Sequence, residues 1–117
     1  MWERYNISAQ QALSQGKATE AENFFRLALK EVENSPSDPK LGTTLNNLAN
    51  CLRQQGRYQE AEPLYKQAIS CTEKRAGHFS KELVVFLENY AKLLRLSGRT
   101  VEAETTDRRA QAIFGKS

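Results

Sequence analysis

A seven-residue pattern that occurs three times in register constrains this chain more than any other feature. Each copy opens with glycine and a cation and closes with Glu-Ala-Glu, and a further alanine follows at a fixed distance. The copies span residues 16–22, 56–62 and 98–104. A regular period of this length is typical of solenoids, in which each unit contacts only its neighbours. The repeat therefore predicts three stacked units that share one continuous core.

Apolar stripes at helical spacing flank each glycine. In the middle unit, leucines recur every three or four residues from Leu41 to Leu52. After the glycine, Ala61, Tyr65 and Ala68 continue the stripe. Glycine suits the end of a helix because it adopts the left-handed conformation without a Cβ penalty. A glutamate in the next turn complements the free N–H groups there. Each unit is thus predicted to be a helix, a tight turn and an antiparallel helix.

Turn and capping residues between the units predict where the remaining helices begin. Asp38 is the expected N-cap before Pro39, and Ser80 is the expected N-cap of a later helix. The predicted helices span residues 2–15, 19–34, 39–55, 59–76, 81–97 and 101–114. The predicted fold class is all-α, a right-handed α-solenoid of three antiparallel helix pairs. We expect one domain over residues 1–117, with repeats at about 2–38, 39–79 and 80–115.

These positions resemble the tetratricopeptide repeat (TPR) family. The matching residues of the middle repeat are Leu45, Leu48, Ala49, Leu52, Gly56, Ala61, Tyr65 and Ala68. The repeat period of this chain is longer than the period of about 34 residues that is common in the family. Segments 44–49 and 60–65 look like the long-repeat branch of the family, which includes kinesin light chains. That branch implies protein–protein recognition, often of peptide segments, without catalysis.

The two ends of the array depart from the family pattern. Asp107 occupies the position at which Phe25 and Tyr65 stand in the earlier repeats. A terminal repeat needs a polar outer face, so we expect the array to stop near residue 114. We expect Trp2 to be at least partly buried at the other end.

The resemblance implies that the first helix of each pair lines a concave surface. The expected groove residues are Asn46, Asn47, Asn50 and Arg53 in the middle repeat, Glu88, Asn89, Lys92 and Arg95 in the third, and Asn6, Gln10 and Ser14 in the first. Asparagine is a mediocre helix former, and its amide both donates and accepts, which suits capture of an extended peptide backbone. The arginine and lysine side chains of this set can bind a carboxylate of the peptide. The alternative interpretation is a solvated helix face.

Residues for catalysis or metal binding are scarce. His78 is the only histidine and lies in an expected linker, which excludes a histidine-based triad or a multi-histidine metal site. Cys51 and Cys71 lack metal-ligand spacing, and we expect them to be free thiols, buried or half-buried. No glycine-rich phosphate loop is present. We therefore predict no enzyme activity, no cofactor and no metal.

Charge and hydropathy narrow the choice of partner. The net charge of +3 comes from 17 basic and 14 acidic side chains without a dense basic run, so nucleic acid is the less favoured partner. No apolar run reaches the length of about 18 residues that a membrane helix needs. We expect a cytoplasmic scaffold that binds a peptide segment or helix of another protein, with a preference for acidic groups. The alternative is a structural unit that forms homo-oligomers through its solenoid ends.

Overall fold

The computed structural model describes residues 1–115, and within them the chain forms six helices and no strand. The helices are α1 (Trp2–Ser14), α2 (Ala18–Val32), α3 (Pro39–Gln54), α4 (Tyr58–Ala76), α5 (Glu82–Leu96) and α6 (Thr100–Gly115). Each predicted helix is present, and the observed bounds differ from the expected ones by at most two residues.

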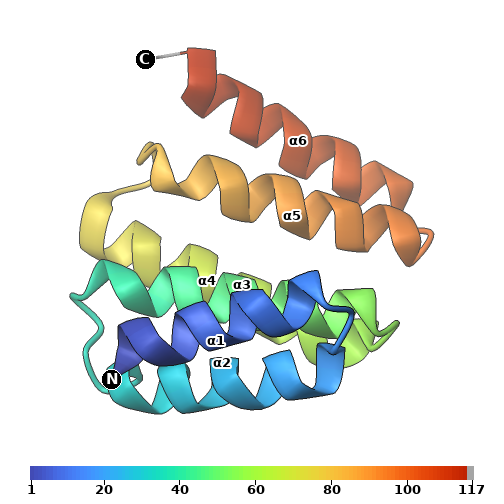
Figure 1. Ribbon diagram of the computed structural model, residues 1–117. Coiled ribbons are helices and arrows are strands. Elements are labelled where there is room, and N and C mark those ends of the chain that lie inside the picture. Colours follow the sequence, from blue (N-terminus) through green and yellow to red (C-terminus); the bar gives the residue numbers. More distant parts are fainter. Residues whose placement is uncertain (116–117) are drawn as a thin grey trace.

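The helices form three antiparallel pairs that stack in chain order (Figure 1). Within the pairs, α1 packs against α2, α3 against α4, and α5 against α6. Between the pairs, α2 packs against α3, α4 packs against α5, and α3 also touches α5. The predicted all-α solenoid is therefore confirmed.

The turn inside each pair is made by the glycine of the repeated pattern. Gly16, Gly56 and Gly98 have φ angles of 74°, 76° and 77°, which a residue with a Cβ adopts only at a cost. In each turn the next backbone N–H reaches back to a carbonyl of the preceding helix, as in a Schellman motif. These bonds join Lys17 N to Ala12 O (2.8 Å), Arg57 N to Leu52 O (2.9 Å) and Arg99 N to Leu94 O (2.8 Å).

The expected N-caps lie between the pairs. Oδ1 of Asp38 accepts the N–H of Lys40 at 2.9 Å, and Pro39 is the first residue of α3. Ser80 is not the N-cap that was expected: α5 begins at Glu82, one residue later than predicted, so the N-cap position falls on Lys81. Oγ of Ser80 still accepts the N–H of Glu82 at 3.3 Å.

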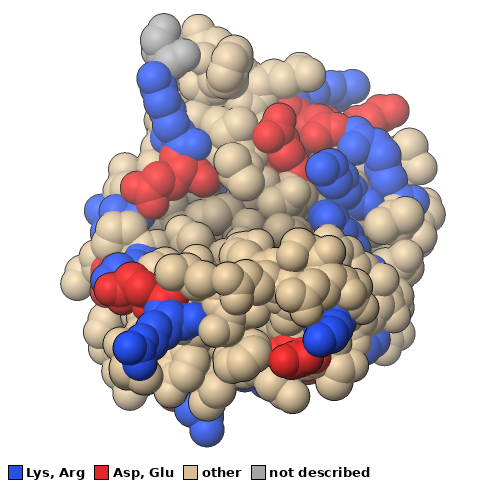
Figure 2. Space-filling model, viewed as in Figure 1, with Lys and Arg blue, Asp and Glu red and all other residues tan. Residues whose placement is uncertain are grey.

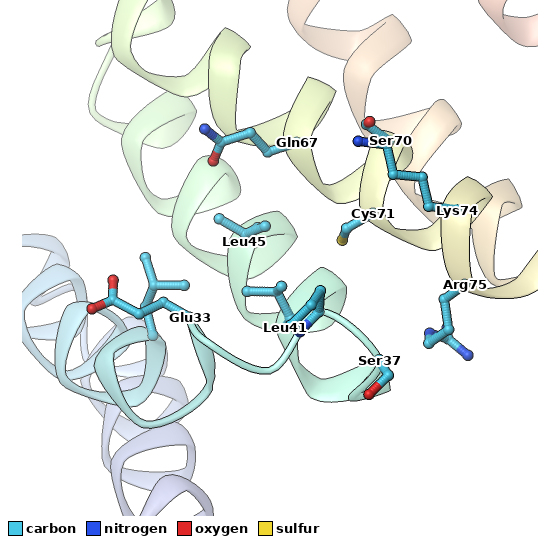
Figure 3. A pocket seen from close by; sticks show the side chains of 11 residues that line it. Glu33, Ser37, Leu41, Leu45, Gln67, Ser70, Cys71, Lys74 and Arg75 are labelled. Atoms are coloured by element: carbon cyan, nitrogen blue, oxygen red, sulfur yellow. The ribbon is translucent and has the colours of Figure 1, made fainter.

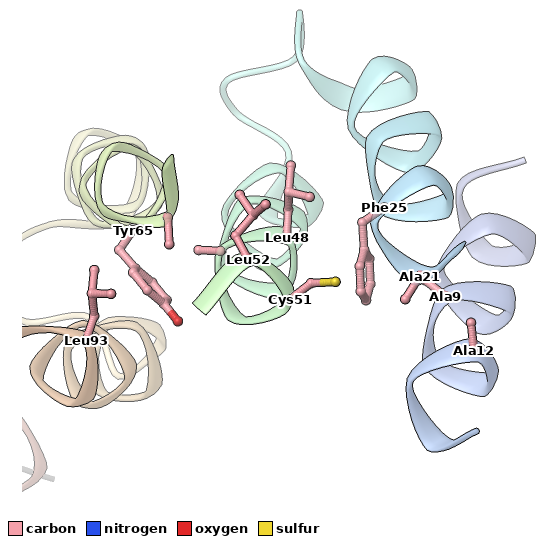
Figure 4. Packing of buried hydrophobic residues seen from close by; sticks show 11 residues of the cluster. Ala9, Ala12, Ala21, Phe25, Leu48, Cys51, Leu52, Tyr65 and Leu93 are labelled. Carbon is pink, nitrogen blue, oxygen red and sulfur yellow. The ribbon is translucent and has the colours of Figure 1, made fainter. Parts of the chain in front are cut away.

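Within residues 1–115 the core consists of three clusters of buried residues, and half-buried Leu29, Leu64 and Tyr90 each pack against more than one of them. Phe25 and Tyr65, the aromatic residues of the repeat, are completely buried, and each fills the space between its own pair and the next (Figure 4). At the far end Asp107 replaces the aromatic residue and pairs with Arg95. At the near end Trp2 is half-buried, and its Nε1 donates to Oγ1 of Thr44 at 2.7 Å.

Gly42 lies where α3 packs closely against both α4 of its own pair and α5 of the next pair. A Cβ at this buried position of α3 would lie 2.9 Å from Oγ1 of Thr72 and 3.2 Å from Cε2 of Phe86. We expect Gly42→Ala to lower the free energy of unfolding by about 1 kcal/mol, because overpacking costs about 1–3 kcal/mol while helix propensity returns about 1 kcal/mol. Urea unfolding measures the change. Gly115→Ala is the control, since a Cβ there meets no atom within 4 Å, and equal stability of the two variants would contradict the prediction.

Candidate functional site

The first helices α1, α3 and α5 carry the residues predicted to line the groove. Hydrogen bonds join α1 to α3 and α3 to α5, so the three helices form one surface with α3 in the middle. Figure 2 shows the molecule hollowed between the part built by α1 and the part built by α5 and α6. The floor of the hollow carries few charges, and acidic and basic side chains gather at its rims.

Two pairs of asparagines join the first helices at equivalent positions of the repeat. Nδ2 of Asn47 donates to Oδ1 of Asn6 at 3.4 Å between α1 and α3. Nδ2 of Asn89 donates to Oδ1 of Asn46 at 3.2 Å between α3 and α5. Asn46 is only 4% exposed. The pairs give a structural reason for asparagine inside these helices, because each buried amide needs a partner.

The other predicted groove residues differ in how far they are already engaged. Asn50 accepts a hydrogen bond from the hydroxyl of buried Tyr65, and Nη1 of Arg53 donates to the carbonyl of Asn89 at 3.4 Å. Arg95 turns toward α6 and its ion pair. The exposed groove residues without an ion pair or hydrogen bond in the described part of the chain are Gln10, Glu88 and Lys92. Ser14 is exposed and bonds to its own helix.

A second set of contacts between the pairs is built from the repeated pattern itself. Oε1 of Glu22 accepts from Nη1 of Arg57 at 2.6 Å, and both carboxylate oxygens of Glu62 accept from Nη1 of Arg99 at 2.8 and 2.9 Å. Each arginine also binds the first glutamate of its own triplet: Arg57 binds Glu60, and Arg99 binds Glu102, both at 2.7 Å. Each arginine therefore ties the start of its own helix to the preceding pair.

Sequence reasoning missed these ion pairs. It assigned the first glutamate of the triplet to the helix N-terminus and gave the second no partner. The signal was the recurrence of the second glutamate and the cation after glycine. The partners lie 35 and 37 residues apart, in different repeats, and only the packing of the pairs brings them together.

The ion pairs shift the pKa values of buried Glu22 and half-buried Glu62. Burial alone would raise the pKa of Glu22, but hydrogen bonds from Arg26, Gln55 and Arg57 outweigh it and lower the pKa below its ordinary value of 4.5. The hydrogen bond from Arg99, with another from Tyr90, lowers the pKa of Glu62 against the effect of burial. Both carboxyls are therefore ionised and paired at neutral pH.

The second helices leave gaps between them. A cavity of about 710 Å³ lies between α2 and α4, with α3 as its floor (Figure 3). A smaller cavity of about 260 Å³ lies between α4 and α6, with α5 as its floor. Neither was predicted from the sequence, because a gap depends on how far two helices separate.

The two cysteines and the histidine are the few reactive side chains considered for catalysis or metal binding. Cys51 is buried, Cys71 is half-buried, both are free thiols, and burial raises the pKa of each. His78 is exposed in the connection before α5, with Nδ1 3.3 Å from Oε2 of Glu73. Among residues 1–115 there is no group of three side chains suited to hold a metal ion. In the same part of the chain, no helix is long and apolar enough to span a membrane.

Comparison with known proteins bears on the family. A family model described as tetratricopeptide repeat matches residues 5–74. No curated protein shows a significant match to this sequence.

Among solved structures, the similarity extends over nearly the whole chain. BtubC (BKLC) from P. vanneervenii superposes with a TM-score of 0.91 at 24% identity, over 99% of this chain and 46% of that one. A Podosopora anserina kinesin light chain with nearly identical TPR-like repeats gives 0.85 at 18% identity, over 97% and 55%. The TPR domain of Arabidopsis FLU gives 0.85 at 16% identity, over 99% and 96%. The chain spans about half the length of the first two proteins, and the similarity shows the fold alone.

The paired glutamates make stability depend on pH. Their pKa values are lower in the folded chain than the ordinary 4.5, so their contribution is complete above pH 4.5 and is lost as the pH falls through the lowered values. We expect Glu62→Gln to be less stable than the parent at pH 7 and to lose less stability between pH 5 and pH 3. Urea unfolding at these pH values tests this. The same acid loss in variant and parent would show that Glu62 contributes nothing to it.

Proposed function

Because the chain belongs to the tetratricopeptide repeat family, we propose that it is a non-catalytic module that holds a peptide segment or helix of another protein against its first helices. The family is generally a protein-interaction scaffold. The proposal treats residues 1–117 as one domain with repeats at about 2–38, 39–79 and 80–115. It also places the protein in the cytoplasm, which the two free thiols support.

The observation that carries the proposal is the contrast between engaged and open side chains on this face. The asparagine pairs and Arg53 hold α1, α3 and α5 in fixed positions, so a ligand meets a surface that needs little ordering. Lys92 projects from α5 without an ion pair in the described residues. Lys92 therefore adds an open cation to this ordered surface. This combination favours a peptide with an acidic side chain.

Charge reversal on this face tests the proposal. We expect Lys92→Glu to weaken capture of partner proteins from a lysate of the source organism at least tenfold, because an acidic ligand would then meet a like charge. Lys30→Glu on α2 is the matched control, since Lys30 is also exposed and lies on a second helix. Quantitative mass spectrometry of the captured proteins is the measurement. An unchanged set of captured proteins would refute the groove.

Stacking through the solenoid ends is the second candidate, and one observation favours it. Glu104 occupies the position of Glu22 and Glu62, yet among the described residues its only ion-pair partner is Arg108 of its own helix, at 4.0 Å. A second copy stacked on this end would bring Lys17, which occupies the position of Arg57 in the repeat, toward Glu104. The charged Asp107 in the aromatic position argues against close stacking there.

The state of association separates the two candidates. For the interaction module we expect a monomer of 13.3 kDa by sedimentation velocity from low micromolar to submillimolar concentration. A mass that grows with concentration in the parent and stays monomeric in Glu104→Lys would favour stacking.

A further inference from the structure

The cavity between α2 and α4 has an apolar floor and charged walls. Leu41 and Leu45 of α3 form the floor with Leu29 of α2. In Figure 3, Glu33 lies on the α2 side, Lys74 and Arg75 lie on the α4 side, and the sulfur of Cys71 points into the space between them. The volume of about 710 Å³ lies within the range of about 300–1,000 Å³ that is usual for ligand pockets.

The equivalent gap between α4 and α6 shows what would close such a cavity. There Arg109 of α6 reaches back to Glu73 of α4, and Ile113 is buried beside the floor. The gap that remains is about 260 Å³.

At the first gap the corresponding residues differ. Gln67 stands at the position of Arg109, and Cys71 stands at the position of Ile113. Glu33, which corresponds to Glu73, forms no ion pair within residues 1–115, and neither does Lys74. Arg75 is already paired with Glu82. The gap between α2 and α4 therefore keeps the carboxylate of Glu33. It lacks both the basic side chain that would pair with this carboxylate and the bulky apolar side chain that would fill the space.

We propose that this cavity binds a short segment of a partner protein that supplies the missing groups. A bulky apolar side chain of the segment covers the leucine floor, a basic side chain pairs with Glu33, and an acidic side chain pairs with Lys74. The opposite charges of the two walls then fix the direction in which the segment lies. This site is separate from the face of the first helices, so one chain can hold two partner segments.

The test uses a variant that copies the closed gap. Gln67→Arg/Cys71→Ile installs at the first gap the two residues that close the second, and we expect it to fold with at least the parent's stability. A phage-displayed library of random 12-residue peptides is depleted on this variant and then selected on the parent. We expect enriched peptides that combine a bulky apolar residue with one base and one acid. They should bind the parent at least tenfold more tightly than the variant by fluorescence anisotropy.

Two further measurements locate the bound peptide. Lys92→Glu should leave its affinity unchanged, which separates this cavity from the proposed groove. Saturating peptide should also slow alkylation of Cys71 severalfold, because Cys71 lines the cavity. Failure to enrich any peptide over the variant, enrichment of peptides without the two charges, or an unchanged rate of Cys71 alkylation would each overturn the proposal. None of these outcomes would affect the groove on the first helices.

Discussion

The joint between neighbouring helix pairs is the contact on which the rest of the structure depends. A single pair cannot bury its own apolar face, so every pair is stable only when the next one covers it. Phe25 and Tyr65 fill the two joints, and the Glu22–Arg57 and Glu62–Arg99 ion pairs hold the same joints at one edge. Apolar packing supplies the larger part of the stability, while the ion pairs and hydrogen bonds fix the position of each pair relative to the next.

The same joints shape the surface that a partner would meet. The asparagine pairs engage side chains of the proposed groove with one another, and they leave only a few open groups on α1 and α5. A peptide that binds here therefore meets a face that is already ordered and mostly neutral, with Lys92 as its open cation. Recognition by such a face rests on fit to a fixed shape and on a small number of polar contacts.

The two joints are alike in their signature residues and different in what surrounds them. The repeated positions give the same turn, the same buried aromatic side chain and the same glutamate–arginine ion pair at each joint. Outside these positions the sequence is free to vary, and Gln67 and Cys71 open a cavity at one joint where Arg109 and Ile113 narrow the other. Differences between repeats are thus the places at which a specific binding property can arise without loss of the fold.

The sequence alone determined the features that depend on neighbouring residues and on period. The six helices, the glycine turns, the Asp38 cap and the burial of Phe25 and Tyr65 all follow from local propensity and from the spacing of apolar residues. The residues predicted for the groove lie on α1, α3 and α5 for the same reason, and their role in binding stays a prediction. Only the tertiary structure decided what their side chains do, because the partners of Asn46, Glu22 and Glu62 lie more than 30 residues away. The size of each gap between second helices was likewise decided by the tertiary structure. It depends on how helices from different repeats pack, which the sequence of a single segment does not reveal.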